Sequence, residues 1–140
     1  MMKIAVVYWS STGNTESMAQ AVAEGAKKAG AETELFTATE FGGDKMDGFD
    51  AVAFGCPAMG AEELEDTEFA PMFEGCEGKL SGKKIALFGS YGWGDGEWMR
   101  TWEETCQSKG ANLVCDSVIC QETPDEDALD ACRKLGEALV

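Results

Sequence analysis

Hydroxyl-bearing residues gather in one short segment near the start of the chain, residues 10–15, which read SSTGNT. A segment with helical spacing follows directly, so these residues would lie at a helix N-terminus, where free backbone N–H groups and the helix dipole bind anions. The nearest basic residues in the sequence are Lys3 and Lys27, and neither lies in this segment. A phosphate here would be held by neutral hydrogen bonds, although a Ser/Thr-rich helix cap without a ligand fits the same residues.

Two later segments could hold a flat ligand. Residues 57–62 read PAMGAE, and their glycine can adopt the positive φ that a type II′ turn requires. Residues 90–96 read SYGWGDG, in which three glycines around Trp93 allow the backbone to approach a ring closely. An indole in such a loop is hard to explain as a core residue, because it would expose a large apolar surface. Residues 57–62 taken alone also fit an ordinary glycine turn with Met59 in the core.

The composition excludes several kinds of chemistry. The chain has no histidine, which removes the commonest general base and metal ligand, and no metal site is expected. None of the six cysteines forms a C-x-x-C pair, so we expect reduced, mostly buried thiols, and Cys56 has no adjacent base to make it a nucleophile. The glycine patterns of P-loops and dinucleotide folds are absent. A net charge of −15 argues against nucleic acid and anionic membranes as partners.

The elements that must position these segments alternate between apolar runs of strand type and stretches with helical periodicity. This alternation predicts a parallel sheet covered on both faces, which binds ligands beyond the carboxyl ends of its strands. Each of the three segments follows a strand. Trp98 and Trp102, four apart on a helix, are expected to pack in the core. The expected strands are 4–9, 32–37 at an exposed edge, 51–55, 85–89 and 112–120 with an interruption at 115–117; the expected helices are 14–29, 66–74, 97–109 and a last helix capped by Thr123.

The three segments closely resemble the FMN-binding loops of short-chain flavodoxins of the clostridial type. The resemblance covers essentially the whole chain and is carried by residues 8–16 (YWSSTGNTE), 55–66 (GCPAMGAEELED) and 87–99 (LFGSYGWGDGEWM). It implies an α/β flavodoxin-like fold: a doubly wound, five-stranded parallel sheet of order 2-1-3-4-5 with helices on both faces, in one FMN-binding domain over residues 1–140. It also implies a low-potential one-electron carrier that uses the semiquinone/hydroquinone couple of non-covalently bound FMN. Such a carrier substitutes for ferredoxin between redox enzymes and turns over no substrate of its own.

The resemblance also assigns roles around the flavin. Met59 would contact one face of the isoalloxazine and Trp93 the other. Glu62 would accept a hydrogen bond from N3–H, and the Gly60–Ala61 peptide would lie beside N5. The cofactor-binding residues implied are Ser10, Ser11, Thr12, Gly13, Asn14, Thr15, Ala58, Met59, Gly60, Ala61, Glu62, Ser90, Tyr91, Gly92, Trp93 and Gly94.

These roles suggest how the two redox steps are separated. A peptide that turns its carbonyl toward N5 only when N5 is protonated would stabilise the neutral semiquinone, by about 0.5–1.5 kcal/mol for one hydrogen bond. The overall charge, with Glu62 and Asp95 near the ring, would disfavour the anionic hydroquinone and lower the second potential. Ala61 stands where family members often have a polar residue or glycine, so no side-chain hydrogen bond can steady this turn.

Low-potential oxidoreductases and ferredoxin-type acceptors with basic patches are the partners that the resemblance implies. We expect a cytoplasmic protein, because the first seven residues turn polar too soon for a signal peptide. We also expect a monomer. Acidic residues of the flavin rim could form the docking face, or a merely solvated one: Glu62, Glu63, Glu65, Asp66, Asp95 and Glu97.

Three other functions are alternatives to the electron carrier. An FMN-dependent NAD(P)H quinone reductase of the same fold usually has extra segments that form a substrate pocket and a dimer, which 140 residues do not supply. An FMN-storage module without an electron partner fits the same loops. A receiver domain needs an acidic cluster after the first strand and an aspartate after the third, where Trp9-Ser10 and Gly55-Cys56 stand instead.

Overall fold

One parallel sheet runs through the protein, whose computed structural model describes residues 2–59, 63–92 and 94–140. The strands are β1 (Lys3–Tyr8), β2 (Glu32–Thr37), β3 (Ala51–Gly55), β4 (Lys84–Tyr91), β5 (Asn112–Leu113) and β6 (Val118–Gln121). They lie in the order β2-β1-β3-β4-β5, and β6 pairs with the end of β4, so that β5 and β6 together fill the fifth position. These pairings are all parallel, and the predicted strand order is confirmed.

Burial separates the central strands from the edge. All of β3 and the middle of β1 and β4 are buried, which is why these runs are apolar without alternation. β2 lies at the edge, and its residues are exposed or half-buried, as the sequence predicted. β4 continues beyond its predicted end at Gly89, because β6 pairs with Ser90 and Tyr91. Those two residues therefore belong to a strand end and not to a loop.

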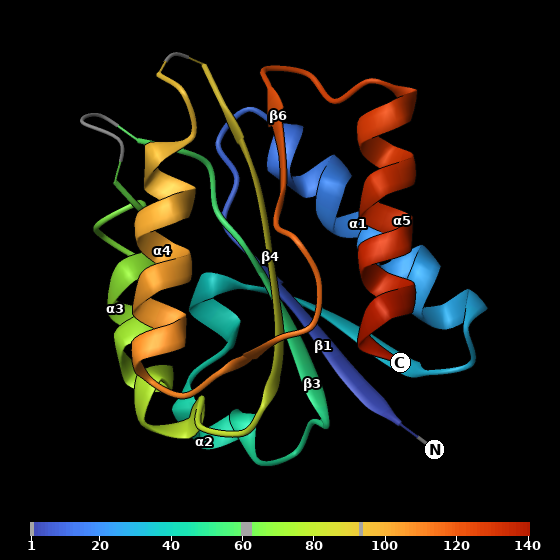
Figure 1. Ribbon diagram of the computed structural model, residues 1–140, viewed down its shortest axis with the longest axis vertical. Helices are drawn as coiled ribbons and strands as arrows, with labels where there is room; N and C mark the ends of the chain where they lie inside the picture. Colours follow the sequence, from blue (N-terminus) through green and yellow to red (C-terminus); the bar gives the residue numbers. More distant parts are fainter. Residues whose placement is uncertain (1, 60–62, 93) are drawn as a thin grey trace.

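Two pairs of helices cover the sheet, one pair on each face (Figure 1). One face is covered by α1 (Asn14–Lys28) and α5 (Glu126–Leu139), and the other by α3 (Phe69–Cys76) and α4 (Glu97–Ser108). The short helix α2 (Gly43–Met46) was not predicted; its Met46 is buried in the core cluster of the second face, together with Phe41. Among the residues described, no helix is long and apolar enough to cross a membrane.

The final helix begins later than predicted. Its N-cap is Asp125, whose backbone is extended and whose carboxylate accepts a 2.8 Å hydrogen bond from the Ala128 N–H. Both properties are typical of an N-cap, and the predicted cap, Thr123, lies two residues too early to reach the first turn. Pro124 therefore precedes the cap instead of opening the helix.

The tryptophans of α4 and the cysteines behave as predicted. Trp98 and Trp102 are each 2% exposed and belong to the core cluster beneath α3 and α4. All six cysteines are free thiols, four of them buried. The sulfur chemistry of the chain is therefore that of packed apolar side chains.

Two glycines let α1 and α5 approach each other closely. A Cβ added at Gly25 would lie 1.9 Å from the Arg133 carbonyl oxygen, and one added at Gly136 would lie 2.1 Å from the Val22 carbonyl oxygen. Real Cβ atoms do not come this near to backbone oxygen, so the two helix backbones pack against each other directly at these points.

Gly136→Ala is therefore expected to lower the free energy of unfolding by roughly 1–3 kcal/mol, because α5 must move away from α1. Gly75→Ala is the matched control: a Cβ there meets no atom within 4 Å, and alanine should raise the stability of α3 by roughly 0.5–1 kcal/mol. Urea unfolding of both variants measures the difference. A gain of stability in Gly136→Ala would contradict the close helix contact.

Candidate functional site

Ser90 joins three segments of the chain at the carboxyl edge of the sheet. Its hydroxyl lies 3.1 Å from the Thr15 hydroxyl in a buried hydrogen bond, and its carbonyl accepts a 3.0 Å hydrogen bond from the Ala58 N–H. Thr15 and Ser90 are 1% and 5% exposed, so water does not compete for this junction. The start of α1, the segment after β3 and the end of β4 are thus held together by one residue.

The segment before α1 forms a cradle of donors. Gly13 has a φ of 94°, in the left-handed region that favours glycine, and its N–H donates to the Ser10 hydroxyl oxygen at 3.1 Å. Among the residues described, the N–H groups of Ser11, Thr12, Asn14 and Thr15 have no protein acceptor. Unused N–H groups at the N-terminus of a 15-residue helix are suited to an anion.

A cavity of about 240 Å³ lies where the three segments meet. Eight of the predicted site residues line it: Ser11, Thr12, Asn14, Ala58, Met59, Ser90, Tyr91 and Gly92. Four others support it or stand beside it, because Ser10 and Gly13 shape the cradle, Thr15 bonds to Ser90, and Gly94 follows with a φ of 88°. The remaining four, Gly60, Ala61, Glu62 and Trp93, lie outside the described residues.

The segment after β3 is fixed at both ends of the predicted turn. Met59 and Glu63 exchange two backbone hydrogen bonds, 2.8 Å from the Met59 N–H and 3.0 Å from the Glu63 N–H. Pro57 precedes them and lines the cavity, which the sequence did not assign to the site. The pairing brings Met59 to the cavity and leaves Glu63 exposed on its outer side.

Glu122 is a second cavity residue that sequence reasoning missed. Its backbone has a φ of 57°, in the left-handed region, and it is the one non-glycine residue in the described part of the chain with a positive φ. Its N–H donates to the Tyr91 carbonyl at 2.7 Å. Such a conformation is uncommon outside glycine and asparagine and often marks functional sites. Its place directly after β6, at the carboxyl end of the fifth strand position, was the available signal.

Cys56 is structural, as the sequence indicated. Its side chain is buried, and burial raises the pKa of the thiol to about 12. The sulfur accepts a hydrogen bond from the Glu65 N–H at 3.4 Å, and the Cys56 carbonyl accepts one from the Trp98 indole N–H at 3.2 Å. A thiol that stays protonated and has no base beside it is a poor nucleophile.

Glu65 is buried, so its predicted place on an exposed acidic rim is wrong. Its carboxylate accepts hydrogen bonds from the N–H groups of Thr67, Glu68 and Phe69, at 2.9, 2.7 and 2.8 Å, and from the Thr67 hydroxyl. Burial opposes ionisation, but these hydrogen bonds outweigh it and lower the pKa of Glu65 to about 2. The carboxylate holds the turn before α3, which is why this helix begins at Phe69 and not at the predicted residue 66.

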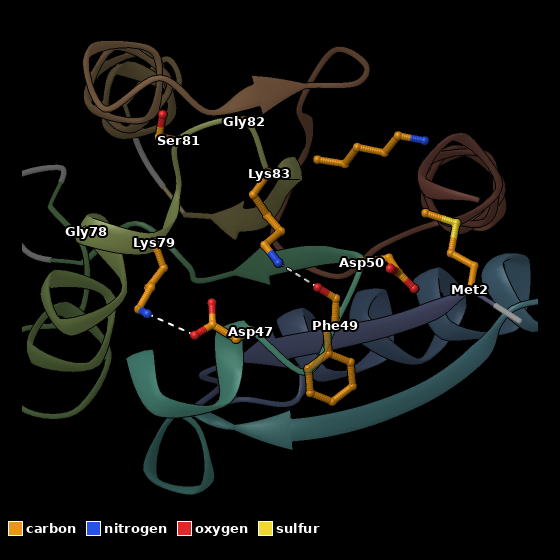
Figure 2. A pocket seen from close by; sticks show the side chains of 10 residues that line it. Met2, Asp47, Phe49, Asp50, Gly78, Lys79, Ser81, Gly82 and Lys83 are labelled. Carbon is orange, nitrogen blue, oxygen red and sulfur yellow. Dashed lines mark hydrogen bonds and ion pairs between the residues drawn. The ribbon is translucent and has the colours of Figure 1, made fainter.

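Lys79 and Lys83 lie at the other end of the sheet (Figure 2). A larger cavity of about 930 Å³ there is lined by Met2 before β1, by the turns that precede β3 and β4, and by Lys84 at the start of β4. Lys79 pairs with Asp47 at 2.9 Å, and Lys83 donates to the carbonyls of Met46 and Phe49 at 3.1 and 2.6 Å. Parallel sheets bind ligands at the opposite, carboxyl end, so we assign the function to the smaller cavity.

The whole chain is similar to known flavodoxins. Residues 6–136 match the family model described as Flavodoxin. The chain is 44% identical to flavodoxins of Megasphaera elsdenii and Clostridium beijerinckii, in both cases over 96% of this chain and at least 96% of the relative. The solution structure of the two-electron reduced Megasphaera elsdenii flavodoxin superposes with a TM-score of 0.89 and covers 97% of each chain. A flavodoxin from the domain Archaea, 26% identical, has a TM-score of 0.86 and covers 99% of this chain and 96% of its own.

Glu65→Gln is expected to lower the free energy of unfolding at pH 7 by roughly 2 kcal/mol, because a neutral amide accepts these hydrogen bonds less strongly. The pKa of Glu65 is lower in the folded than in the unfolded chain, so its contribution is present above about pH 5 and is lost as the pH falls toward about 2. The difference between wild type and variant should therefore shrink over that range in denaturant titrations. Glu104→Gln, on the exposed side of α4, serves as control and should change little; a difference that persists at pH 2 would contradict the assignment.

Proposed function

Because the chain belongs to the flavodoxin family, we propose that residues 1–140 form one FMN-binding domain that carries single low-potential electrons between larger redox proteins. It is an electron-transfer protein and not an enzyme with its own substrate. FMN supplies the redox chemistry when it is bound, and the residues of the chain bind it, orient it and set the charge around it.

The observation that carries this proposal is the donor cradle before α1. A phosphate monoester presents acceptor oxygens, and the cradle presents four unused N–H groups together with the hydroxyls of Ser11 and Thr12. None of the described residues that line the cavity is basic. The chemistry of the donor set therefore fits an FMN phosphate held by neutral hydrogen bonds and the helix dipole.

The flavin ring belongs in the part of the cavity formed by the other two segments. Met59 and Tyr91 line it from the ends of β3 and β4, and Gly92 exposes backbone beside them. In this arrangement Met59 contacts one face of the ring. Glu62 would accept from the ring N3–H and Trp93 would contact the other face, as the family resemblance implies; both residues lie outside the described ranges. Ser90 and Thr15 act by positioning the three segments.

The charge of the surroundings favours a low potential. Glu122 is the charged residue among the described residues of the cavity lining, and the whole chain carries a net charge of −15. Each electron added to the flavin without a compensating proton places a further negative charge among these groups, which is unfavourable in a site of reduced dielectric. Within the described lining no basic side chain offsets this repulsion.

The partners we propose are low-potential oxidoreductases and ferredoxin-type acceptors with basic patches, which an acidic carrier meets faster because of electrostatic steering. The proposed carrier is a cytoplasmic monomer.

The cradle can be tested with apoprotein. FMN is expected to bind at least about 100-fold more tightly than riboflavin, because several neutral hydrogen bonds of about 0.5–1.5 kcal/mol each are made only to the phosphate. Thr12→Val should weaken FMN binding by roughly 3- to 10-fold and leave riboflavin binding unchanged, whereas Thr33→Val on the edge strand β2 should change neither. Quenching of flavin fluorescence measures both affinities, and equal affinities for the two flavins would overturn the assignment.

Potentiometry tests the carrier itself. Anaerobic titration of the purified yellow protein is expected to show two separate one-electron steps, the second at the lower potential, because the second electron adds charge to an already acidic site. The visible spectrum followed during titration distinguishes the two steps. A single two-electron wave, or steady NADH oxidation with a quinone and no added reductase, would favour an enzyme over a carrier.

A further inference from the structure

A groove of about 300 Å³ lies between α3 and α4, outside the cofactor site. The two helices lie side by side over the same face of the sheet (Figure 1), and each presents one stripe of residues to the groove. In α3 the stripe is Ala70, Phe73 and Glu74, which is continued by Glu77, and in α4 it is Trp98, Thr101, Trp102 and Thr105. The spacing of three and four residues in both helices shows that whole helix faces form its walls.

The floor of the groove is aromatic. Phe73, Trp98 and Trp102 line it, each 2% exposed, and the Phe73 and Trp102 rings meet edge to face with centroids 5.6 Å apart. Within the described part of the chain, the indole N–H of Trp102 is buried without a hydrogen-bond acceptor. A buried donor in this state is rare in native proteins, so the floor is not a fully satisfied surface.

The rim of the groove is acidic on the α3 side. Four carboxylates stand there, on Glu63, Asp66, Glu74 and Glu77. Among the residues described, none of the four forms an ion pair or a side-chain hydrogen bond. The groove therefore combines an apolar floor with uncompensated negative charge, which suits an apolar group flanked by cations.

The groove lies next to the cofactor site. Trp98 lines the groove, its ring lies 5.5 Å from that of Tyr91, and Tyr91 lines the site cavity. Glu63 on the rim is hydrogen-bonded through its backbone to Met59, a second cavity residue. A group seated in the groove would lie beside the wall of the cofactor site, separated from it by these two contacts.

We propose that this groove is the docking site for a surface segment of a redox partner that inserts one apolar side chain between α3 and α4 and places lysine or arginine against the acidic rim. The proposal rests on the carrier function and adds to it the surface by which the carrier is recognised. The apolar side chain supplies specificity, because charge attraction alone would act over the whole acidic chain. A second copy of the chain is a poor occupant, since two molecules of charge −15 repel each other.

Two short peptides separate the apolar from the charged contribution. The ¹⁵N-labelled, FMN-loaded protein is titrated at low salt with acetyl-KKLKK-amide and with acetyl-KKSKK-amide, which differ only in the central side chain. The indole N–H resonance of Trp102, assigned with the Trp102→Phe variant, reports on the groove floor. The leucine peptide is expected to shift this resonance and to bind at least about tenfold more tightly than the serine peptide.

Two charge-matched variants locate the binding. Glu74→Gln with Glu77→Gln removes two rim charges and should weaken binding of the leucine peptide several-fold. Glu32→Gln with Glu34→Gln removes two exposed charges from the edge strand β2 and should leave binding unchanged. The flavin absorbance, recorded in each sample, reports separately on the proposed cofactor.

Three results would overturn the docking proposal whatever the flavin content: equal affinities for the two peptides, equal effects of the two variant pairs, or a Trp102 resonance that does not move. A shift of that resonance with protein concentration in the absence of peptide would assign the groove to a second copy of the chain, and would also overturn it. Protein without flavin absorbance would instead contradict the proposed function.

Discussion

The buried contact between Thr15 and Ser90 is the constraint on which the site depends. Three segments far apart in the chain must meet at one sheet edge, and each has a loop conformation that could vary by itself. Ser90 removes this freedom, because its hydroxyl bonds to the first turn of α1 while its carbonyl holds Ala58. Since both hydroxyls are shielded from water, losing either partner would leave the other unsatisfied in the interior. The contacts of the chain itself thereby shape the cavity between the segments.

The described lining of the site contains no basic side chain, so the site and the whole chain are negative alike. The donors of the cradle are dipoles, and dipoles can hold a phosphate without neutralising its charge. At the far end of the sheet, Lys79 pairs with Asp47, and Lys83 donates to the carbonyls of the turn before β3. These two lysines stabilise the turns there and lie away from the cofactor cavity. The end of the molecule that binds the ligand is left negative. That separation suits a carrier whose reduced form should give its electron away readily.

The carboxylates of the segment after β3 divide into two groups with opposite uses. Glu65 is turned inward and ends in four hydrogen bonds that set the start of α3. Glu63 and Asp66, its near neighbours, stay on the surface at the rim of the groove. The buried Glu65 carboxylate thus fixes the backbone that carries Glu63 and Asp66. The same short stretch stabilises the start of α3 and supplies negative charge to the proposed docking groove.

The amino-acid sequence by itself determined the order of elements, the exposed edge strand and the cradle before α1. Each of these depends on local patterns: apolar runs, helical periodicity, and hydroxyls with a glycine at a helix N-terminus. Four features were decided only by the tertiary structure. β4 extends through Ser90 because β6, nearly thirty residues later, pairs with it, and Glu65 is buried because its segment folds back over Cys56. Glu122 reaches the cavity because the parallel strands end at one edge of the sheet. The groove exists because α3 and α4 pack side by side. Contacts between residues distant in sequence leave no periodic signal along the chain, which is why these four could be seen only in the folded molecule.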